Sequence, residues 1–288
     1  MKQTDVTFGH RESVRQEYEA KLSQSGGFCA HQLETEFGYD QEDQTAIPQD
    51  AIDSSFGCAN PLAMGTLNEG GSVLDLGCGA GLDVILAARR VGANGKVIGV
   101  DMTGAMIEKA RANVAAAGLD HIAEIRKGLI ESLPVESSSV DWVISNCVVS
   151  LSPEKEQVFA EVHRVLKPGG KMLLTDLVMA PLPGWLRRLV ALKSPAAAKA
   201  LDRDRYLQTI AGSGLMNVSV RSQLDYDASM LRGLAQDELN IRMGLWQALL
   251  TLNRGQLTSH LLRPMVEPGI RLAANKVASI KVYAEKPV

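Results

Sequence analysis

Between residues 72 and 178 the chain alternates between two hydrophobic patterns. Short, nearly continuous apolar runs have the length of buried strands and occupy residues 72–76, 96–102, 122–128, 140–149 and 171–178. Segments in which apolar positions recur every three or four residues are typical of amphipathic helices and occupy residues 82–91, 104–118 and 154–166. This alternation predicts an α/β fold in which helices cover both faces of a largely parallel sheet.

The pattern is weaker on either side of this region. Residues 7–22 predict a polar helix, whereas residues 38–61 are rich in Asp, Gln, Ser and Pro and have no sustained period, as in a loop. After Pro181 helical patterns dominate. The last run, residues 276–287, alternates apolar and polar positions like an antiparallel strand on the edge side of the sheet.

These patterns divide the chain into three parts. We expect residues 1–62 to form an N-terminal helix and a segment that covers the substrate. Residues 63–180 would form the ligand-binding core, and residues 181–288 would supply cap helices and the last strands that complete the sheet.

The charge balance bears on the partners of the protein. The chain of 288 residues has 30 basic and 33 acidic residues, a net charge of −3, which is too close to neutral to predict binding to nucleic acid or to an anionic membrane. No apolar run approaches the roughly 20 residues that span a bilayer. The polar N-terminus, MKQTDVTFGHRESVRQ, lacks the apolar centre of a signal peptide. We therefore expect a cytoplasmic protein with no nucleic-acid or membrane partner.

The cysteines are candidates for chemistry. The four of them, Cys29, Cys58, Cys78 and Cys147, are widely spaced and form no CxxC pair. In a reducing compartment we expect free thiols rather than a disulfide framework. The histidines are scattered without the spacing of metal ligands, so we expect no metal site.

A glycine loop follows the first predicted strand. The sequence VLDLGCGAG places Gly77, Gly79 and Gly81 between this strand and its helix. Glycine lets the main chain turn sharply and lets a ligand approach it closely. The second strand closes at Asp101, where a carboxylate can accept hydrogen bonds from both ribose hydroxyls of a nucleoside. The loop follows Asp75-Leu76 and lacks the further glycine of the dinucleotide fingerprint.

Together with LP after the third strand and the later VLKPGG, this loop resembles the class I S-adenosylmethionine-dependent methyltransferases over about residues 71–178. The resemblance implies a Rossmann-like fold and S-adenosyl-L-methionine as cofactor. It implies that the glycine loop contacts the methionine part of the cofactor, that Asp101 binds the ribose, and that Ile130 and Glu131 flank the adenine. The full set of implied cofactor-binding residues is Asp75, Gly77, Gly79, Gly81, Asp101, Met102, Ile130, Glu131 and Asn146.

The flanking sequences narrow the resemblance. The chain is similar to the arsenite methyltransferase family over about residues 38–178 and again at the C-terminus. The segments that show this are GYDQEDQTAIPQDAIDSSFGCANP, VIGVDMTGAMIEKARAN, SNCVVSLSP and the C-terminal VASIKVYAEKP. The resemblance implies that Cys58 and Cys147 are arsenic-binding thiolates. Cys29 lies in a region where many members of that family also have cysteines, and it is a further candidate ligand.

Trivalent arsenic suits such a site. It is a soft centre that thiolates bind selectively, and its lone pair would attack the methyl group of the cofactor sulfonium in line. Positioning two bound reactants supplies much of the acceleration in such a transfer. The lone pair carries no proton, so no general base is required, whereas an oxygen or nitrogen acceptor would usually need one.

The chain departs from this family in its cap. Bacterial members usually have a third cysteine there, but SPAAAKAL places Ser194 or Ala196 at the expected position, and no cysteine follows Cys147. A site with two thiols can bind a monomethylated arsenical. Inorganic arsenite would need Cys29, water or a small thiol as third ligand. We expect a small thiol such as glutathione, or a thioredoxin-type reductant, as partner.

Other interpretations remain open. The acceptor of a methyltransferase with this fold can be an organic metabolite, in which case His31 or a cap residue would be the candidate base. A non-catalytic metalloid-binding protein is a further possibility, which the intact glycine loop and Asp101 disfavour. Cys58 and Cys147 can also be small buried packing residues. Asn146, at the end of the fourth strand, either contacts the cofactor or acceptor or braces a loop.

Overall fold

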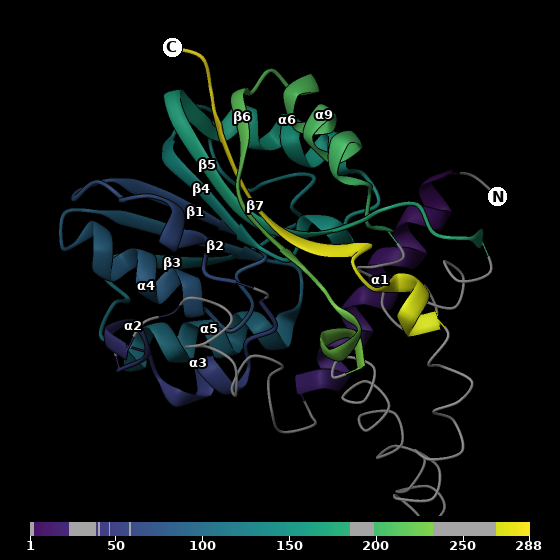
Figure 1. Cartoon of the computed structure of the whole chain (residues 1–288). Coiled ribbons are helices and arrows are strands. Elements are labelled where there is room, and N and C mark those ends of the chain that lie inside the picture. The colour runs from purple at the N-terminus through teal and green to yellow at the C-terminus, as the bar shows by residue number, and fades with distance from the viewer. Residues whose placement is uncertain are drawn as a thin grey trace, which may run out of the picture.

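The computed structural model describes residues 3–22, 39, 41–45, 47–57, 59–184, 199–232 and 269–288. Within these residues a seven-stranded sheet crosses the molecule in the order β3-β2-β1-β4-β5-β7-β6 (Figure 1). Its strands are β1 (Ser72–Leu76), β2 (Lys96–Asp101), β3 (Ala123–Lys127), β4 (Val140–Asn146), β5 (Leu166–Met179), β6 (Met216–Asp225) and β7 (Val277–Glu285).

The sheet is parallel except at one side. β1 pairs in parallel with β2 and β4, and the β2–β3 and β4–β5 pairs are also parallel. The predicted α/β fold is therefore confirmed. β7 is antiparallel, as predicted, but its place at the edge side is wrong, because it pairs with β5 on one side and with β6 on the other. Alternation of apolar and polar residues reports that the two faces of a strand differ, and it does not report how many neighbours the strand has.

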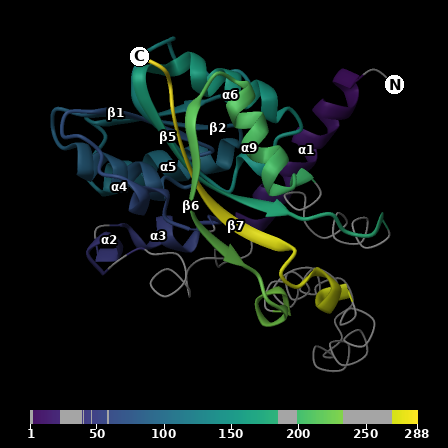
Figure 2. The ribbon, with the colours of Figure 1, turned by 45° about the horizontal axis from the view of Figure 1, so that its top comes forward.

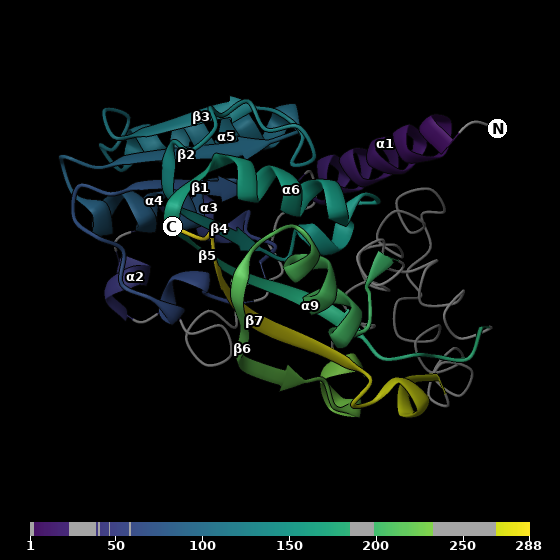
Figure 3. The same cartoon turned by 90° about the horizontal axis from the view of Figure 1, so that it is seen from above.

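Helices cover both faces of this sheet (Figures 2 and 3). On one face α4 (Leu82–Val91) and α5 (Gly104–Ala116) pack over β1, β2 and β3. On the other face α6 (Lys155–Val165) and α9 (Arg203–Gly212) lie side by side and pack over β5 and β6. Each face has its own apolar core, with Val73 and Ile144 in the first and Leu74 and Ile280 in the second.

The segment before β1 contains short helices. α2 (Gln41–Thr45), α3 (Gln49–Asp53) and the 3-10 helix η1 (Pro61–Met64) replace much of the predicted loop. Each is too short to show a helical period. α3 buries Ala51 and Ile52 in the core below α4 and α5, and the Asp43 carboxylate of α2 forms an ion pair of 3.1 Å with Arg90 of α4. Prediction from periodicity fails here because tertiary contacts stabilise these turns.

The polar N-terminal helix is confirmed as α1 (Gln3–Leu22). Among its residues whose burial is described, Val14 is the one that is buried, with 3% of its surface exposed. No helix within the described residues combines the length and the hydropathy that a bilayer crossing requires.

A buried carboxylate joins the second helical layer to the sheet. Asp176 on β5 has no exposed surface, and its Oδ2 accepts a hydrogen bond of 2.7 Å from the hydroxyl of Tyr206 on α9. Burial raises the pKa of the Asp176 carboxyl above its usual value. The Tyr206 ring also packs edge-on against Phe159 of α6, with ring centroids 5.7 Å apart. One side chain therefore connects both helices to the sheet.

Tyr206→Phe keeps the ring and removes the hydroxyl. We expect it to lower the free energy of unfolding by about 1.5–3 kcal/mol, because the buried carboxylate loses a charge-assisted hydrogen bond that water cannot replace. Urea denaturation of the two proteins measures the difference. Gln208→Ala, an exposed position on the same helix, is the control and should change stability by no more than about 0.5 kcal/mol. Equal stability of Tyr206→Phe and the native protein would contradict the assignment.

Candidate cofactor and acceptor site

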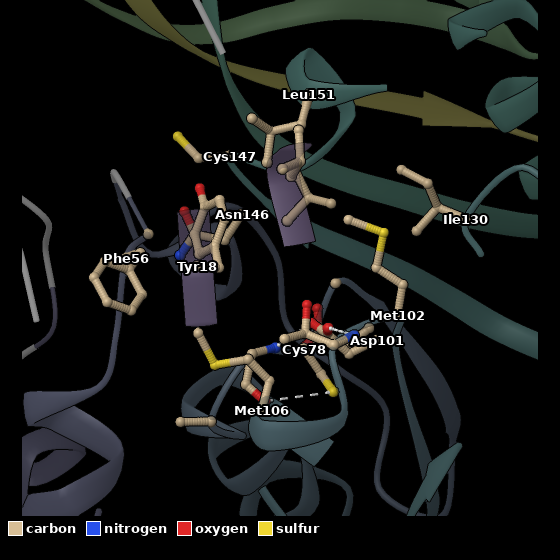
Figure 4. A pocket seen from close by; sticks show the side chains of 18 of the residues that line it. Tyr18, Phe56, Cys78, Asp101, Met102, Met106, Ile130, Asn146, Cys147 and Leu151 are labelled. Atoms are coloured by element: carbon tan, nitrogen blue, oxygen red, sulfur yellow. Dashed lines mark hydrogen bonds between the residues drawn. The ribbon is translucent and has the colours of Figure 1, made fainter. Parts of the chain in front are cut away.

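The carboxyl ends of β1, β2 and β4 meet at one edge of the sheet. The strand order places β2 on one side of β1 and β4 on the other, and ligands of open α/β sheets bind in the crevice at such a reversal. A pocket lies there, with Phe56 and Tyr18 near Asn146 at one end and Asp101, Met102 and Ile130 farther along (Figure 4). Eight of the nine predicted cofactor residues line it, namely Asp75, Gly77, Gly79, Asp101, Met102, Ile130, Glu131 and Asn146. The ninth, Gly81, is not among the lining residues, although its loop neighbours Ala80 and Leu82 are.

The glycine loop needs its glycines for two different reasons. Gly77 has φ 67°, and a Cβ atom there would lie 2.5 Å from the Val148 side chain, so neither the conformation nor the space permits another residue. Gly81 caps α4 at φ 91°, and a Cβ there would lie 3.3 Å from Ala110 of α5. The amides of Gly77 and Cys78 both donate to the Val100 carbonyl, at 2.8 and 3.0 Å. The loop is thus held against the end of β2.

Asp101 fixes the other side of the loop. Its Oδ2 accepts a hydrogen bond of 3.0 Å from the Gly79 amide, and its Oδ1 accepts one of 2.8 Å from the Thr103 amide. Burial raises the pKa of the Asp101 carboxyl, although these amide donors act in the opposite direction. The carboxylate that the sequence assigns to the ribose therefore also supports the loop.

Two more carboxyl groups are buried in the same pocket. Asp75 is 2% exposed, and burial, with smaller contributions from the charges of Asp83 and Asp101, raises its pKa well above the usual value. Burial also raises the pKa of Asp83 to about 6, against the hydrogen bonds that Asp83 accepts from Asn146 and Tyr39. Carboxylates crowded in this way favour a bound cation. Strongly raised pKa values in a cleft are also common at functional sites.

The helix α1 closes one side of the pocket. Arg11, Val14 and Tyr18 all line it. The His10 Nε2 lies 2.9 Å from the Leu151 carbonyl, and the Tyr18 ring packs edge-on against Phe56 with centroids 5.5 Å apart. The sequence placed Val14 and Tyr18 on one face of this helix, but its polar composition and lack of a motif did not indicate the contacts of His10 and Arg11.

Arg11 connects α1 to the side of the pocket where Ile130 and Glu131 lie, the residues predicted to flank the adenine. Its guanidinium pairs with Glu131, with Nε and Oε1 3.4 Å apart, and also with Glu154. Glu131 is 8% exposed and accepts a second hydrogen bond of 2.6 Å from the Ser152 hydroxyl. The carboxylate that the sequence placed beside the adenine is therefore held by two protein partners.

Asn146 occupies the end of β4 and uses its whole amide. Its Nδ2 donates to the Tyr39 hydroxyl at 3.1 Å and to the Asp83 Oδ2 at 3.0 Å. Its Oδ1 accepts from the Thr175 hydroxyl at 2.9 Å and from the Ala59 amide at 3.3 Å. These contacts brace the segment before β1 against the sheet. A contact with the cofactor stays a prediction.

Cys147 follows directly and lines the pocket. Its φ of 59° is a left-handed conformation that is uncommon for residues other than glycine, and its amide donates to the Thr175 carbonyl at 2.8 Å. Cys147 is disulfide-bonded, and the other half of that bond lies outside the described residues. The expectation of free thiols is therefore wrong for Cys147.

Cys78 is a free, buried thiol, and burial raises its pKa well above the usual value. Several residues singled out in the sequence lie outside the described part of the chain, namely Cys29, His31, Cys58, Ser194 and Ala196. Within the described part, no group of three His, Cys, Asp or Glu side chains is arranged to hold a metal ion.

Comparison with known proteins gives a consistent result. A family model described as a methyltransferase domain matches residues 67–220. The arsenite methyltransferase of Halobacterium salinarum is 48% identical over 167 residues, which cover 56% of this chain and 42% of that protein. The chain therefore spans less than half the length of this curated relative.

Two solved structures share the fold. An arsenic(III) S-adenosylmethionine methyltransferase from Chlamydomonas reinhardtii superposes with a TM-score of 0.63 at 28% identity, over 85% of this chain and 73% of that one. A phosphoethanolamine N-methyltransferase of Haemonchus contortus, in complex with S-adenosyl-L-methionine, reaches a TM-score of 0.58 at 19% identity, over 80% of this chain and 51% of that one. At this identity the second likeness concerns the fold alone.

Asp101→Ala should reduce the affinity for S-adenosylmethionine at least about tenfold, since a hydrogen bond to a charged group contributes about 1.5–3 kcal/mol. Isothermal titration calorimetry measures the affinity, and the melting temperature checks that the fold persists. Asp120→Ala removes an exposed carboxylate beyond α5 and is the control. Unchanged affinity in Asp101→Ala would remove this residue from the cofactor site.

The buried carboxylates also predict a dependence on pH. The pKa of Asp83 is raised to about 6, so the pocket loses negative charge as the pH falls through that value. S-adenosylmethionine carries a sulfonium cation that S-adenosylhomocysteine lacks. We therefore expect the affinity for S-adenosylmethionine to fall more than the affinity for S-adenosylhomocysteine between about pH 7.5 and 5. The difference should reach up to about tenfold for each unit by which the bound cation lowers a carboxyl pKa. In Asp83→Asn the two affinities should depend on pH more nearly alike. If they already fall in parallel in the native protein, the charge of Asp83 does not act on the sulfonium.

Proposed function

The chain belongs to the class I S-adenosylmethionine-dependent methyltransferases, and we propose that it transfers the methyl group to trivalent arsenic held by cysteine thiolates. The observation that carries this proposal is Cys147, a cysteine with left-handed backbone geometry that lines the cofactor pocket. Its flanking sequence, SNCVVSLSP, is similar to the arsenite methyltransferases. The similarity to an arsenic(III) methyltransferase of known structure extends over 85% of the chain and supports the same acceptor.

The pocket residues fit the cofactor. The glycine loop leaves open the space that a side chain at Gly77 would fill, and the buried carboxyl of Asp75 suits the ammonium group of the methionine part. Asp101 would accept hydrogen bonds from the ribose hydroxyls, while Met102 and Ile130 offer apolar surface to the adenine. When bound, the cofactor supplies an electrophilic methyl group on a sulfonium.

The acceptor side would consist of thiolates. Cys147 and Cys58 would bind arsenic as a chelate, in which the second bond forms at the high effective concentration that the first creates. Thiolates are the soft ligands that such a centre prefers. The lone pair of such an acceptor carries no proton, so the transfer needs no general base.

The site would need a reductant before it binds arsenic. Cys147 is disulfide-bonded, and reduction by two electrons and two protons converts a disulfide into two thiols. Two molecules of glutathione, or one thioredoxin-type dithiol, supply these and become the new disulfide. We propose such a thiol as the partner of this protein in a cytoplasmic setting.

The acceptor would be methylarsenite rather than arsenite. No cysteine follows Cys147, so the cap supplies no third thiolate. A monomethylated arsenical has two exchangeable positions and is saturated by two thiolates, whereas arsenite has three. Arsenite would react more slowly, with a small thiol as third ligand.

The decisive experiment incubates the reduced protein with S-adenosylmethionine and methylarsenite, arsenite or no metalloid, and identifies the products by chromatography with arsenic detection. We expect the dimethylated product to form fastest from methylarsenite. Cys147→Ser and Cys58→Ser should each abolish turnover rather than halve it, because a chelate with one arm lost no longer holds the acceptor.

Cofactor affinity and melting temperature should stay close to the native values in both serine variants. Retained arsenic methylation in Cys147→Ser would overturn the proposal. Cofactor binding without any methylated arsenical, in the reduced native protein, would point instead to an organic acceptor.

A further inference from the structure

We infer that Asn146 and Gly57 form an amide clamp that positions the chain on both sides of residue 58 against the strand that ends at Cys147. The inference rests on the proposed function, since it concerns how the two cysteines would be brought to one acceptor. It makes Asn146 and Gly57 positioning residues, which act through the thiolates and do not touch the reacting atoms.

The first observation is the saturation of the Asn146 amide. A side-chain amide has two N–H donors and two acceptor lone pairs, and the four bonds to Tyr39, Asp83, Thr175 and Ala59 use all of them. The partners come from the segment before β1, from α4 and from β5. A displacement of this amide would therefore break contacts in several elements at once.

The second observation is the closeness of Gly57 to the same amide. A Cβ atom at Gly57 would lie 2.7 Å from the Asn146 Cγ and 2.9 Å from its Oδ1, and closer still to its Nδ2. Real Cβ atoms do not approach heavy atoms so closely, so one group would have to move. Gly57 does not have positive φ, and glycine is therefore needed here for space and not for its conformation.

Together the contacts hold both chain neighbours of residue 58. Gly57 lies so close to the Asn146 amide that a Cβ atom would not fit between them, and the Ala59 amide donates to the same side chain. Asn146 is also the covalent neighbour of Cys147, whose own amide is held by the Thr175 carbonyl. Figure 4 shows Phe56, Asn146 and Cys147 along one end of the pocket.

The consequence is preorganisation. A chelating pair binds tightly only if its second arm is already near the first, because the effective concentration of the second thiolate falls when the connecting chain is free to move. The amide clamp restricts the segment before β1 without contributing an atom to the acceptor. Loosening it should therefore weaken arsenic binding and leave the cofactor loop as it is.

The test is a double-mutant cycle of Gly57→Ala, Asn146→Ala and the double variant. Each protein is reduced with a phosphine, which adds no competing thiol, and titrated with phenylarsine oxide, a trivalent arsenical with two exchangeable positions. We expect Gly57→Ala to weaken this affinity by about tenfold or more. In the Asn146→Ala background the same substitution should have little effect, because the side chain that its Cβ meets is gone.

Two readouts separate positioning from general damage. The affinity of Gly57→Ala for S-adenosylmethionine should stay within about twofold of the native value, and Gly212→Ala, where a Cβ would meet nothing within 4 Å, should bind the arsenical normally. If Gly57→Ala does not fold, Tyr39→Phe serves instead. It removes a hydroxyl that contacts Asn146, Asp83 and the Ala59 carbonyl, and should likewise weaken the arsenical.

The outcomes are distinct. Normal arsenical affinity in Gly57→Ala, or an equal loss in both backgrounds of the cycle, would overturn the amide clamp while leaving the proposed acceptor in place. Failure of the reduced native protein to bind phenylarsine oxide would overturn the proposed function together with the inference.

Discussion

The parallel pairing of β4 with β1 is the constraint on which the site depends. Its register places Leu76 opposite Ser145, so the glycine loop and the Asn146-Cys147 pair leave the sheet side by side. This closeness explains why Gly77 cannot carry a side chain, since Val148 fills the space beside it. The main-chain pairing of β1 with β4 brings the cofactor loop and the cysteine together, and bonds to the Val100 carbonyl, the Asp101 carboxylate and the Thr175 carbonyl then hold each of them.

Charge is concentrated where the sheet opens. Asp75 and Asp83 are buried and Asp101 is partly buried, and burial raises the pKa of each. Several buried carboxyl groups close together do not stabilise a fold, and such unfavourable arrangements are expected at functional sites. A bound cation offsets the repulsion between the carboxylates, and the sulfonium of the cofactor is such a cation.

The acceptor end of the pocket combines strain with redox chemistry. Cys147 has left-handed backbone geometry that a non-glycine residue adopts only when its surroundings impose it, and here the Thr175 carbonyl and the saturated Asn146 amide do so. The same cysteine is disulfide-bonded. The proposed function requires that this disulfide be reduced before the thiolate can bind an acceptor.

Much of the fold was predictable because its signals are local. The helix over residues 82–91, the glycine loop and the strand that closes at Asp101 each depend on neighbouring residues, and the structure contains them as predicted. The short helices α2 and α3 and the interior position of β7 were not predictable, since each is stabilised by contacts with distant parts of the chain.

The site divides in the same way. The sequence by itself determined which residues are candidates for the site, because the GxGxG loop, Asp101 and the cysteines can be recognised from residue types and their order. Tertiary structure alone decided that Arg11 pairs with Glu131, 120 positions away in the chain. It also decided that the Asn146 amide forms hydrogen bonds with four partners and that Cys147 is in a disulfide. The physical reason is that hydrogen bonds and ion pairs between distant segments depend on the register and packing of the sheet, which no local pattern of residues records.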